Sequence, residues 1–221
     1  MANVVKRPPF ALLALAVALC AAGARAESRS IDGWGRITAF GGYRYVPNGY
    51  FAEKAAEAGA PMKKPSPGGP QGGASFGYGA FSFLEVTIDL LIGYETFELE
   101  GQAPFSSVTY GGLLGARFTK LDLLFTGFAP YAGVQAGPIL SIVTSNSAPQ
   151  PEKFLGGIAI NGGFNYRFTE RLGINLDVRW MFARNYVEPI AGCNVGGLWV
   201  SLGFSVFFPP APKADLDVPG F

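Results

Sequence analysis

The sequence predicts an all-β fold, an eight-stranded antiparallel up-and-down transmembrane β-barrel, and three observations support this prediction. Hydrophobic residues make up 49% of the chain and charged residues only 15%, against roughly 25% charged in an ordinary globular protein. After the N-terminal segment, no apolar run reaches the ~20 residues of a membrane-spanning helix. Segments with alternating apolar and polar residues recur along the chain. The hydrophobic residues are therefore distributed over strands, and a hydrocarbon surrounding would require those strands to close into a barrel.

The first 26 residues predict a secretory signal peptide. Lys6 and Arg7 precede an apolar run that begins at Phe10. Ala24 and Ala26 then place small residues at the −3 and −1 positions of a signal-peptidase cleavage site. We therefore expect a signal peptide over 1–26, a barrel over 27–208 and a short Pro-rich periplasmic tail over 209–221.

The two cysteines suggest alternatives that the sequence makes less favourable. Cys20 would suit a lipoprotein, but Leu19 precedes it, where lipid attachment requires a small side chain. Cleavage of the signal would leave Cys193 as the only thiol, so no internal disulfide is expected. Cys193 then either pairs with another chain or is an unreactive residue of the last external loop.

Eight segments are predicted as strands, separated by Gly-rich, Pro-rich or polar breaks. They are Trp34–Tyr45, Ser75–Leu84, Val86–Phe97, Val108–Thr119, Pro130–Val143, Phe154–Phe168, Gly173–Arg184 and Gly197–Phe208. Longer or Pro/Gly-rich connections follow the first, third, fifth and seventh strands, and short ones follow the second and sixth. This asymmetry is typical of a transmembrane meander.

Two connections are unusual. Residues 47–73 are rich in Pro, Gly and Ala and predict a long loop with one helical turn at Ala52–Ala58. The segment TKLDLLFTGFAP, residues 119–130, is too long and too apolar for an ordinary short turn. The alternation in the strands does not explain it.

Alternation alone fits a soluble lipocalin-like barrel equally well, with the two faces inverted. The positions of the lysines distinguish the two, because a water-exposed strand face normally carries Lys. Every Lys after the signal segment falls in a predicted loop, turn or tail: Lys54, Lys63, Lys64, Lys120, Lys153 and Lys213. The apolar face is therefore expected to point outward toward lipid, with Val86, Ile88, Leu90, Ile92 and Tyr94 in one strand and Ile174, Leu176, Val178, Trp180 and Phe182 in another.

The charges within the predicted strands are mainly Arg with a few acids, a set that suits an enclosed space where a planar guanidinium pairs with a carboxylate. We expect these residues to form a polar network inside the barrel: Arg36, Arg44, Asp89, Glu95, Arg117, Arg167, Asp177 and Arg179.

The hairpin GGFNYRFTERLGINLDVRW, residues 162–180, and the closing strand GGLWVSLGFSVFF, residues 196–208, resemble the small outer-membrane barrel family, that is, the OmpA-like transmembrane domain and its OmpX-like and OmpW-like relatives. The resemblance implies a location in the outer membrane of a Gram-negative envelope, periplasmic termini and external loops. It also implies recognition by the barrel-assembly machinery, through a signal of the family's kind at Ser201, Gly203, Val206 and Phe208, although here a tail follows that strand.

No enzymatic activity, cofactor or metal site is expected. Enzymes of this family use a His as general base, and the chain contains no His. Gly73–Gly77 matches G-x-S-x-G but lies in a predicted loop without a triad base. Asp89 and Glu95 are better explained as partners of arginines than as an acid/base pair. With a net charge of +1 and no basic block beyond Lys63 and Lys64, nucleic acid is not an expected partner.

These observations favour an outer-membrane barrel with a structural or surface-interaction role and a lumen filled by its Arg/Asp/Glu network. One alternative is an OmpW-like narrow channel that passes small or hydrophobic molecules sideways into the membrane. Another is an adhesin or defence protein that acts on an extracellular ligand through its long external loops. The fold alone does not separate these functions.

Overall fold

The computed structural model describes residues 30–46, 49–57, 59–64, 68–101, 104–145, 148–149, 153–187, 190–194 and 196–209. The expected signal peptide, with Cys20, Ala24 and Ala26, lies outside the described residues, and so does the tail after Pro209. Cys193 lies in a short strand of the last long connection.

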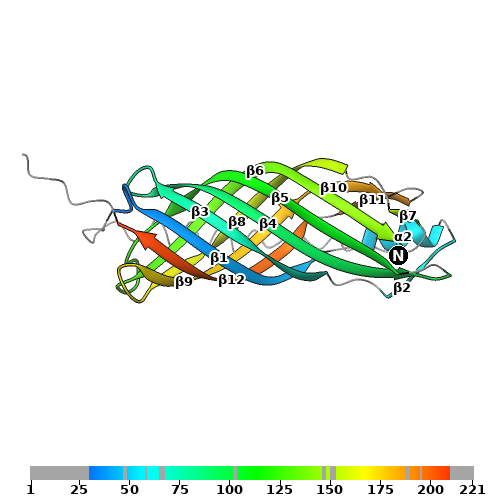
Figure 1. Ribbon diagram of the computed structural model, residues 1–221, viewed down its shortest axis with the longest axis horizontal. Coiled ribbons are helices and arrows are strands. Elements are labelled where there is room, and N and C mark those ends of the chain that lie inside the picture. Colours follow the sequence, from blue (N-terminus) through cyan, green and yellow to red (C-terminus); the bar gives the residue numbers. More distant parts are fainter. Residues whose placement is uncertain are drawn as a thin grey trace, which may run out of the picture.

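Eight long strands form a closed antiparallel barrel (Figure 1), as predicted. In chain order they are β1 (Gly35–Tyr45), β3 (Gly69–Gly79), β4 (Leu84–Leu99), β5 (Phe105–Thr119), β6 (Phe128–Ser145), β8 (Lys153–Arg167), β9 (Leu172–Phe182) and β12 (Gly197–Phe208). Each strand pairs with the next, and β12 pairs with β1 from Gly35↔Phe208 to Tyr45↔Leu198, which closes the barrel. Among the described residues, none of the helices has the length and apolar character to cross a membrane.

The two ends of the barrel differ (Figure 1). At one end, which we call the turn end, residues 80–83, 120–127 and 168–171 connect neighbouring strands. The other end, the loop end, carries the helix α2 (Gly49–Glu57) and the short strands β2 (Met62–Lys64), β7 (Ala148–Pro149), β10 (Arg184–Val187) and β11 (Ile190–Asn194). Helix α2 contacts β11, so the first and last long connections meet above the barrel.

A small apolar core holds the loop end together. Ala55 of α2, Ala60 and Leu99 are buried against one another, and Met62, Phe97 and Phe105 pack on them. Helix α2 overlaps the helical turn expected at Ala52–Ala58 and begins three residues before it, while Ala58 lies outside the described residues. Its apolar face covers the ends of β4 and β5.

The second strand was predicted wrongly as Ser75–Leu84, because β3 spans Gly69–Gly79 and a turn follows it. Its first half consists largely of glycine, which hides the alternation that identifies a strand. Glycine is required at Gly73, where an added Cβ would lie 2.0 Å from the carbonyl oxygen of Leu90. The G-x-S-x-G match therefore lies within a strand, where Ser75 points inward and is buried.

The apolar connection of residues 120–127 divides its side chains between two environments. Leu121 points inward and is buried with Ile31 and Ala129 at the turn end. Asp122 adopts a positive φ of 53° and its side chain accepts a hydrogen bond of 2.6 Å from the backbone N–H of Gly127. Leu124 and Phe125 are exposed on the outside. The segment is therefore apolar because some of its side chains are buried inside the barrel and others lie on its outer surface.

Candidate functional site in the barrel interior

A charged cluster lies in the middle of the barrel, around Asp89 of β4. The guanidinium of Arg117 on β5 donates a hydrogen bond of 2.9 Å to the Oδ2 atom of Asp89, and Arg179 on β9 donates to the same oxygen. Gln135 donates a third, at 2.8 Å. Arg179 also donates to Asp177 at 3.3 Å, and Arg117 lies 3.9 Å from Asp177. Two arginines thus face two carboxylates, and the cluster is balanced in charge.

Neutral side chains extend this central cluster across the barrel. Tyr131 of β6 donates a hydrogen bond of 2.8 Å to Asp177, and Asn161 of β8 donates one of 3.1 Å to the same carboxylate oxygen. Asn175 in turn donates to the hydroxyl of Tyr131 at 3.0 Å. The ring of Tyr131 also stacks with the guanidinium of Arg117, whose carbon lies 4.8 Å from the ring centroid. The cluster therefore connects four neighbouring strands, β5, β6, β8 and β9, with β4.

A separate ion pair lies toward the turn end. Arg36 of β1 forms a two-pronged contact with Glu85 of β4, with hydrogen bonds of 2.8 and 3.2 Å. Arg36 also donates to the hydroxyl of Thr38 at 2.6 Å, and that hydroxyl lies 2.8 Å from the hydroxyl of Ser205. The contact between Thr38 and Ser205 crosses the junction of β1 and β12, where the barrel closes.

Another ion pair lies toward the loop end. Arg44 of β1 donates a hydrogen bond of 3.1 Å to Glu95 of β4, and both side chains are buried. The guanidinium carbon of Arg44 also lies 5.4 Å from the centre of the Trp199 ring. Among the described residues, the ion pairs of the interior therefore fall into three groups, one central and one toward each end.

A layer of apolar side chains fills the interior beside the central cluster. It consists of one buried residue from each of six strands: Leu91, Leu113, Ile139, Ala159, Met181 and Trp199. Along β4, Leu91 is the next inward residue after Asp89 toward the loop end, and Met181 follows Arg179 in the same way on β9. The layer therefore lies on the loop-end side of the central cluster, which separates that cluster from the Arg44–Glu95 pair.

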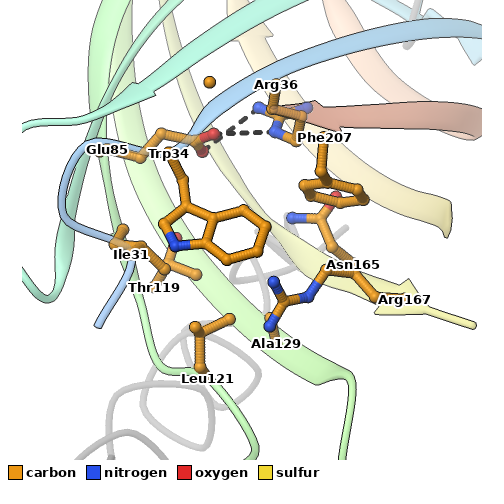
Figure 2. Close-up of a pocket in the computed structure, with 12 residues that line it drawn as sticks. Ile31, Trp34, Arg36, Glu85, Thr119, Leu121, Ala129, Asn165, Arg167 and Phe207 are labelled. Atoms are coloured by element: carbon orange, nitrogen blue, oxygen red, sulfur yellow. Dashed lines mark hydrogen bonds and ion pairs between the residues drawn. The ribbon is translucent and has the colours of Figure 1, made fainter. Parts of the chain in front are cut away.

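The turn end of the interior contains a small cavity of about 30 Å³ (Figure 2), which is large enough to hold a water molecule. Figure 2 shows Arg167 facing the ring of Trp34, and its guanidinium carbon lies 4.6 Å from the centre of that ring. Phe207 lies on another side of this guanidinium, at 5.7 Å. A wider, open hollow of about 440 Å³ outside also has Trp34, Leu121 and Arg167 in its lining. These three side chains therefore line both the small inner cavity and the outer hollow.

The eight residues that the sequence suggested for the interior are distributed over all of these groups. Seven are buried inside: Arg36, Arg44, Asp89, Glu95, Arg117, Asp177 and Arg179. Arg167 lies at the turn end and is only partly buried. Asp89 and Glu95 belong to different groups of ion pairs, and each is the partner of an arginine.

Sequence reasoning missed several interior residues. Glu85 was placed between two predicted strands, so it was not considered as the partner of Arg36. Tyr131 was not assigned inward, because aromatic residues were expected outside. The apolar layer had a signal in the sequence, since Leu90–Ile92, Leu113–Leu114 and Trp180–Phe182 are runs in which both strand faces are apolar.

Among the residues suggested as an assembly signal, Ser201 and Gly203 face the interior, whereas Val206 and Phe208 face outward. The alternation of β12 is therefore regular through its last residue. Recognition of this strand by assembly machinery remains a prediction.

The chain therefore has the fold of the small eight-stranded outer-membrane barrels, with a closed barrel, short turns at one end and a filled interior. The chain is similar to the outer membrane protein OprG from Pseudomonas aeruginosa, with a TM-score of 0.54, 16% identity, and coverage of 83% of this chain and 99% of that one. It is also similar to Neisserial surface protein A, NspA, with a TM-score of 0.51, 16% identity, and coverage of 79% and 96%. The N-terminal β-barrel domain of Pseudomonas aeruginosa OprF matches with a TM-score of 0.45, 15% identity, and coverage of 80% and 98%.

No protein-family model matches the chain, and no curated protein matches it in sequence. OprG and NspA therefore confirm the resemblance at the level of the fold. At 16% identity they do not transfer a ligand or an activity.

Proposed function

We propose that the protein is an integral barrel of a bacterial outer membrane, with a structural or surface-interaction role, a closed interior and no enzymatic activity. The observation that carries this proposal is the filling of the interior by the charge-balanced central cluster and the adjacent apolar layer. An eight-stranded barrel is narrow enough for its own side chains to fill it. A solute would have to displace both the ion pairs and the apolar side chains in order to pass.

The outer surface supports residence in a membrane. On β4, Val86, Ile88, Leu90, Ile92 and Tyr94 alternate with buried residues and are 41–53% exposed. At ~3.4 Å per residue and a strand tilt of ~40°, this apolar stretch rises by roughly 21 Å, which is most of the ~25 Å band of outer-membrane barrels. A continuous exposed apolar band of this kind is unfavourable in water and favourable in lipid.

We propose that the termini lie in the periplasm and that the loop end faces outward. The loop end carries the structured elements, α2 with β11 and β2 with β4, that form a surface for extracellular ligands. An adhesin or defence role would act through this surface and is compatible with a closed interior. Assembly in the membrane would use the last strand, with Ser201, Gly203, Val206 and Phe208.

Fractionation and surface proteolysis test location and orientation. We expect the protein in the outer-membrane fraction, and we expect a protease added to intact cells to cut near Lys63, whose side chain is 64% exposed at the loop end. Cleavage only after the cells are opened would show that the loop end faces the periplasm. Recovery in the soluble fraction would contradict the membrane assignment.

One observation favours the channel alternative, with an exit through the wall. The β5–β6 register passes from Gly111↔Ile139 to Leu114↔Ala136 without pairing Gly112 or Leu113. Pro138 of β6 lies at this point, and proline has no N–H to donate to the neighbouring strand. The ladder between β5 and β6 is therefore interrupted at this point.

The variant Pro138→Val, which restores the missing N–H, separates the two functions. If small hydrophobic molecules leave through this part of the wall, the variant lowers their uptake by cells that produce the protein. If the interior is closed, the wild type and the variant give the same uptake as cells that lack the protein.

A further inference from the structure

Two of the turns expose large apolar side chains where short polar turns are expected. In residues 80–83, Phe81 is 60% and Phe83 is 53% exposed. In residues 120–127, Leu124 is 65% and Phe125 is 52% exposed. We call these two segments the apolar turns. Leu121 of the second segment is buried inside the barrel, whereas these four side chains point outward.

The apolar turns are continuous with the apolar outer face of the barrel. The rings of Phe81 and Phe83 stack with centroids 6.5 Å apart, and the ring of Phe83 stacks on that of Phe118 at 6.2 Å. Phe118 belongs to β5 and is 56% exposed on its outward face. The outward apolar surface therefore does not end at the last strand residue but continues around the turn.

The second apolar turn is joined to the outer face in the same way. The ring of Phe125 lies 4.9 Å from that of Phe128 on β6 and 5.8 Å from that of Tyr166 on β8. Within this turn, the two charged residues Lys120 and Asp122 are half-buried, and Asp122 accepts the hydrogen bond from Gly127. The tip, residues 123–126, is uncharged.

The third turn of the turn end differs from the apolar turns because most of its exposed residues are polar or charged. The apolar turns connect β3 to β4 and β5 to β6, four strands that are consecutive around the barrel. The third turn, between β8 and β9, exposes Thr169, Glu170 and Arg171 beside Phe168. The two halves of the turn end therefore present different surfaces.

Exposed tyrosines occur at both ends of the outer face, whereas the large side chains that the apolar turns expose are Phe and Leu. The loop end exposes Tyr43, Tyr45 and Tyr94, and Tyr78 is exposed beside the first apolar turn; tyrosine hydroxyl groups suit the boundary between headgroups and hydrocarbon. The apolar turns expose Phe, which has no polar atom to keep it at that boundary. Phe and Leu side chains are favoured deeper, among the acyl chains.

We propose that the apolar turns are immersed among the phospholipid acyl chains of the leaflet at the turn end, so that the barrel sits deeper on the β3–β6 side than on the β8–β9 side. This inference rests on the proposed membrane location. The partner is lipid, because the exposed surface is an uninterrupted extension of the outward apolar band.

Site-directed spin labelling in vesicles of phosphatidylcholine and phosphatidylethanolamine tests the proposal. Cys20 and Cys193 are first replaced by Ser. Single cysteines are then introduced at exposed positions: Phe83→Cys and Leu124→Cys in the apolar turns, Glu170→Cys in the polar turn, and Ile88→Cys in the middle of the outer face. Each label is measured for collision with oxygen, which concentrates in hydrocarbon, and with a water-soluble nickel chelate. Heat-modifiable gel mobility verifies that each variant is folded.

We expect the labels at Phe83 and Leu124 to behave as the label at Ile88 does, with frequent oxygen collisions and a loss of collisions with the nickel chelate. The label at Glu170 should show the opposite pattern. If the Ile88 label is in hydrocarbon while Phe83 and Leu124 match Glu170, the turns are exposed to water and our inference is wrong. If the folded Ile88 variant itself collides freely with the chelate, the membrane location fails and the inference fails with it.

Discussion

The central cluster and the apolar layer beside it close the same interior by different physical means. In the central cluster, ion pairs fill the interior, and Asp89 is shared between Arg117 and Arg179. In the apolar layer, packed side chains fill it, and Leu113 and Ile139 have no exposed area. The comparison indicates that a defect in the first recruits water, whereas a defect in the second leaves a dry gap.

The largest effect is expected for Asp89→Ala. This change leaves Arg117 and Arg179 with only Asp177 as a charged partner in the central cluster, and removal of one member of a buried ion pair typically costs about 3–5 kcal/mol. We expect a loss of that size in the free energy of unfolding, measured by urea titration of heat-modifiable mobility. Asp89→Asn, which keeps the shape and loses the charge, is the matched control. Equal stability of wild type and Asp89→Ala would show that the cluster is not a paired unit.

Leu113→Ala makes the corresponding defect in the apolar layer. The loss in the free energy of unfolding should be about 2–3 kcal/mol, the lower part of the range for a buried leucine, because the flexible Met181 in the same cluster can shift toward the gap. Since apolar cavities stay dry, this variant should not conduct ions in a planar bilayer. Conduction by Leu113→Ala would remove the distinction between the two regions.

Glu95→Gln sharpens the comparison at the loop end, beyond the apolar layer. The amide keeps a hydrogen-bond acceptor for Arg44 but removes the charge, and Trp199 still contacts the guanidinium. We expect a loss of about 1.5 kcal/mol, the scale of one hydrogen bond to a charged group, measured by the same urea titration. A loss as large as that of Asp89→Ala would mean that the three charged groups act as one network.

The smallest effect is expected for Lys63→Ala. Its amino group lies 3.7 Å from Glu98, but the two side chains are 64% and 38% exposed. Exposed pairs of this kind contribute less than about 1 kcal/mol, so the urea midpoint should hardly move. A large shift would indicate that β2 and α2 form part of the cooperative fold of the barrel.

Alternation predicted most of this fold because the period of two is strong wherever each face has one chemistry. On β9, Ile174 and Val178 face outward while Asp177 and Arg179 face inward, as the sequence indicated. Alternation did not predict the first half of β3, where glycines occupy positions on both faces of the strand. It also failed in the turn of residues 120–127, where Leu121 and Leu124 have similar side chains but opposite environments.

The contacts inside the barrel were less predictable than the strands. Which arginine meets which carboxylate depends on the stagger of eight strands, and no local pattern specifies that stagger. Arg36 pairs with Glu85 and Arg44 with Glu95 only because β1 and β4 lie on opposite sides of β3 at fixed registers. The apolar layer requires the same information, since Leu91 and Trp199 are far apart in sequence and share one cluster.

The most direct test of the closed interior is the conductance of the purified protein in a planar bilayer, with the wild type measured beside Asp89→Ala. We predict no steady conductance for the wild type, because the central cluster and the apolar layer both block the path. We predict measurable conductance, or at least frequent openings, for Asp89→Ala, because the two arginines then recruit water. Steady conductance of the wild type, unchanged in Asp89→Ala, would contradict the account and support a channel.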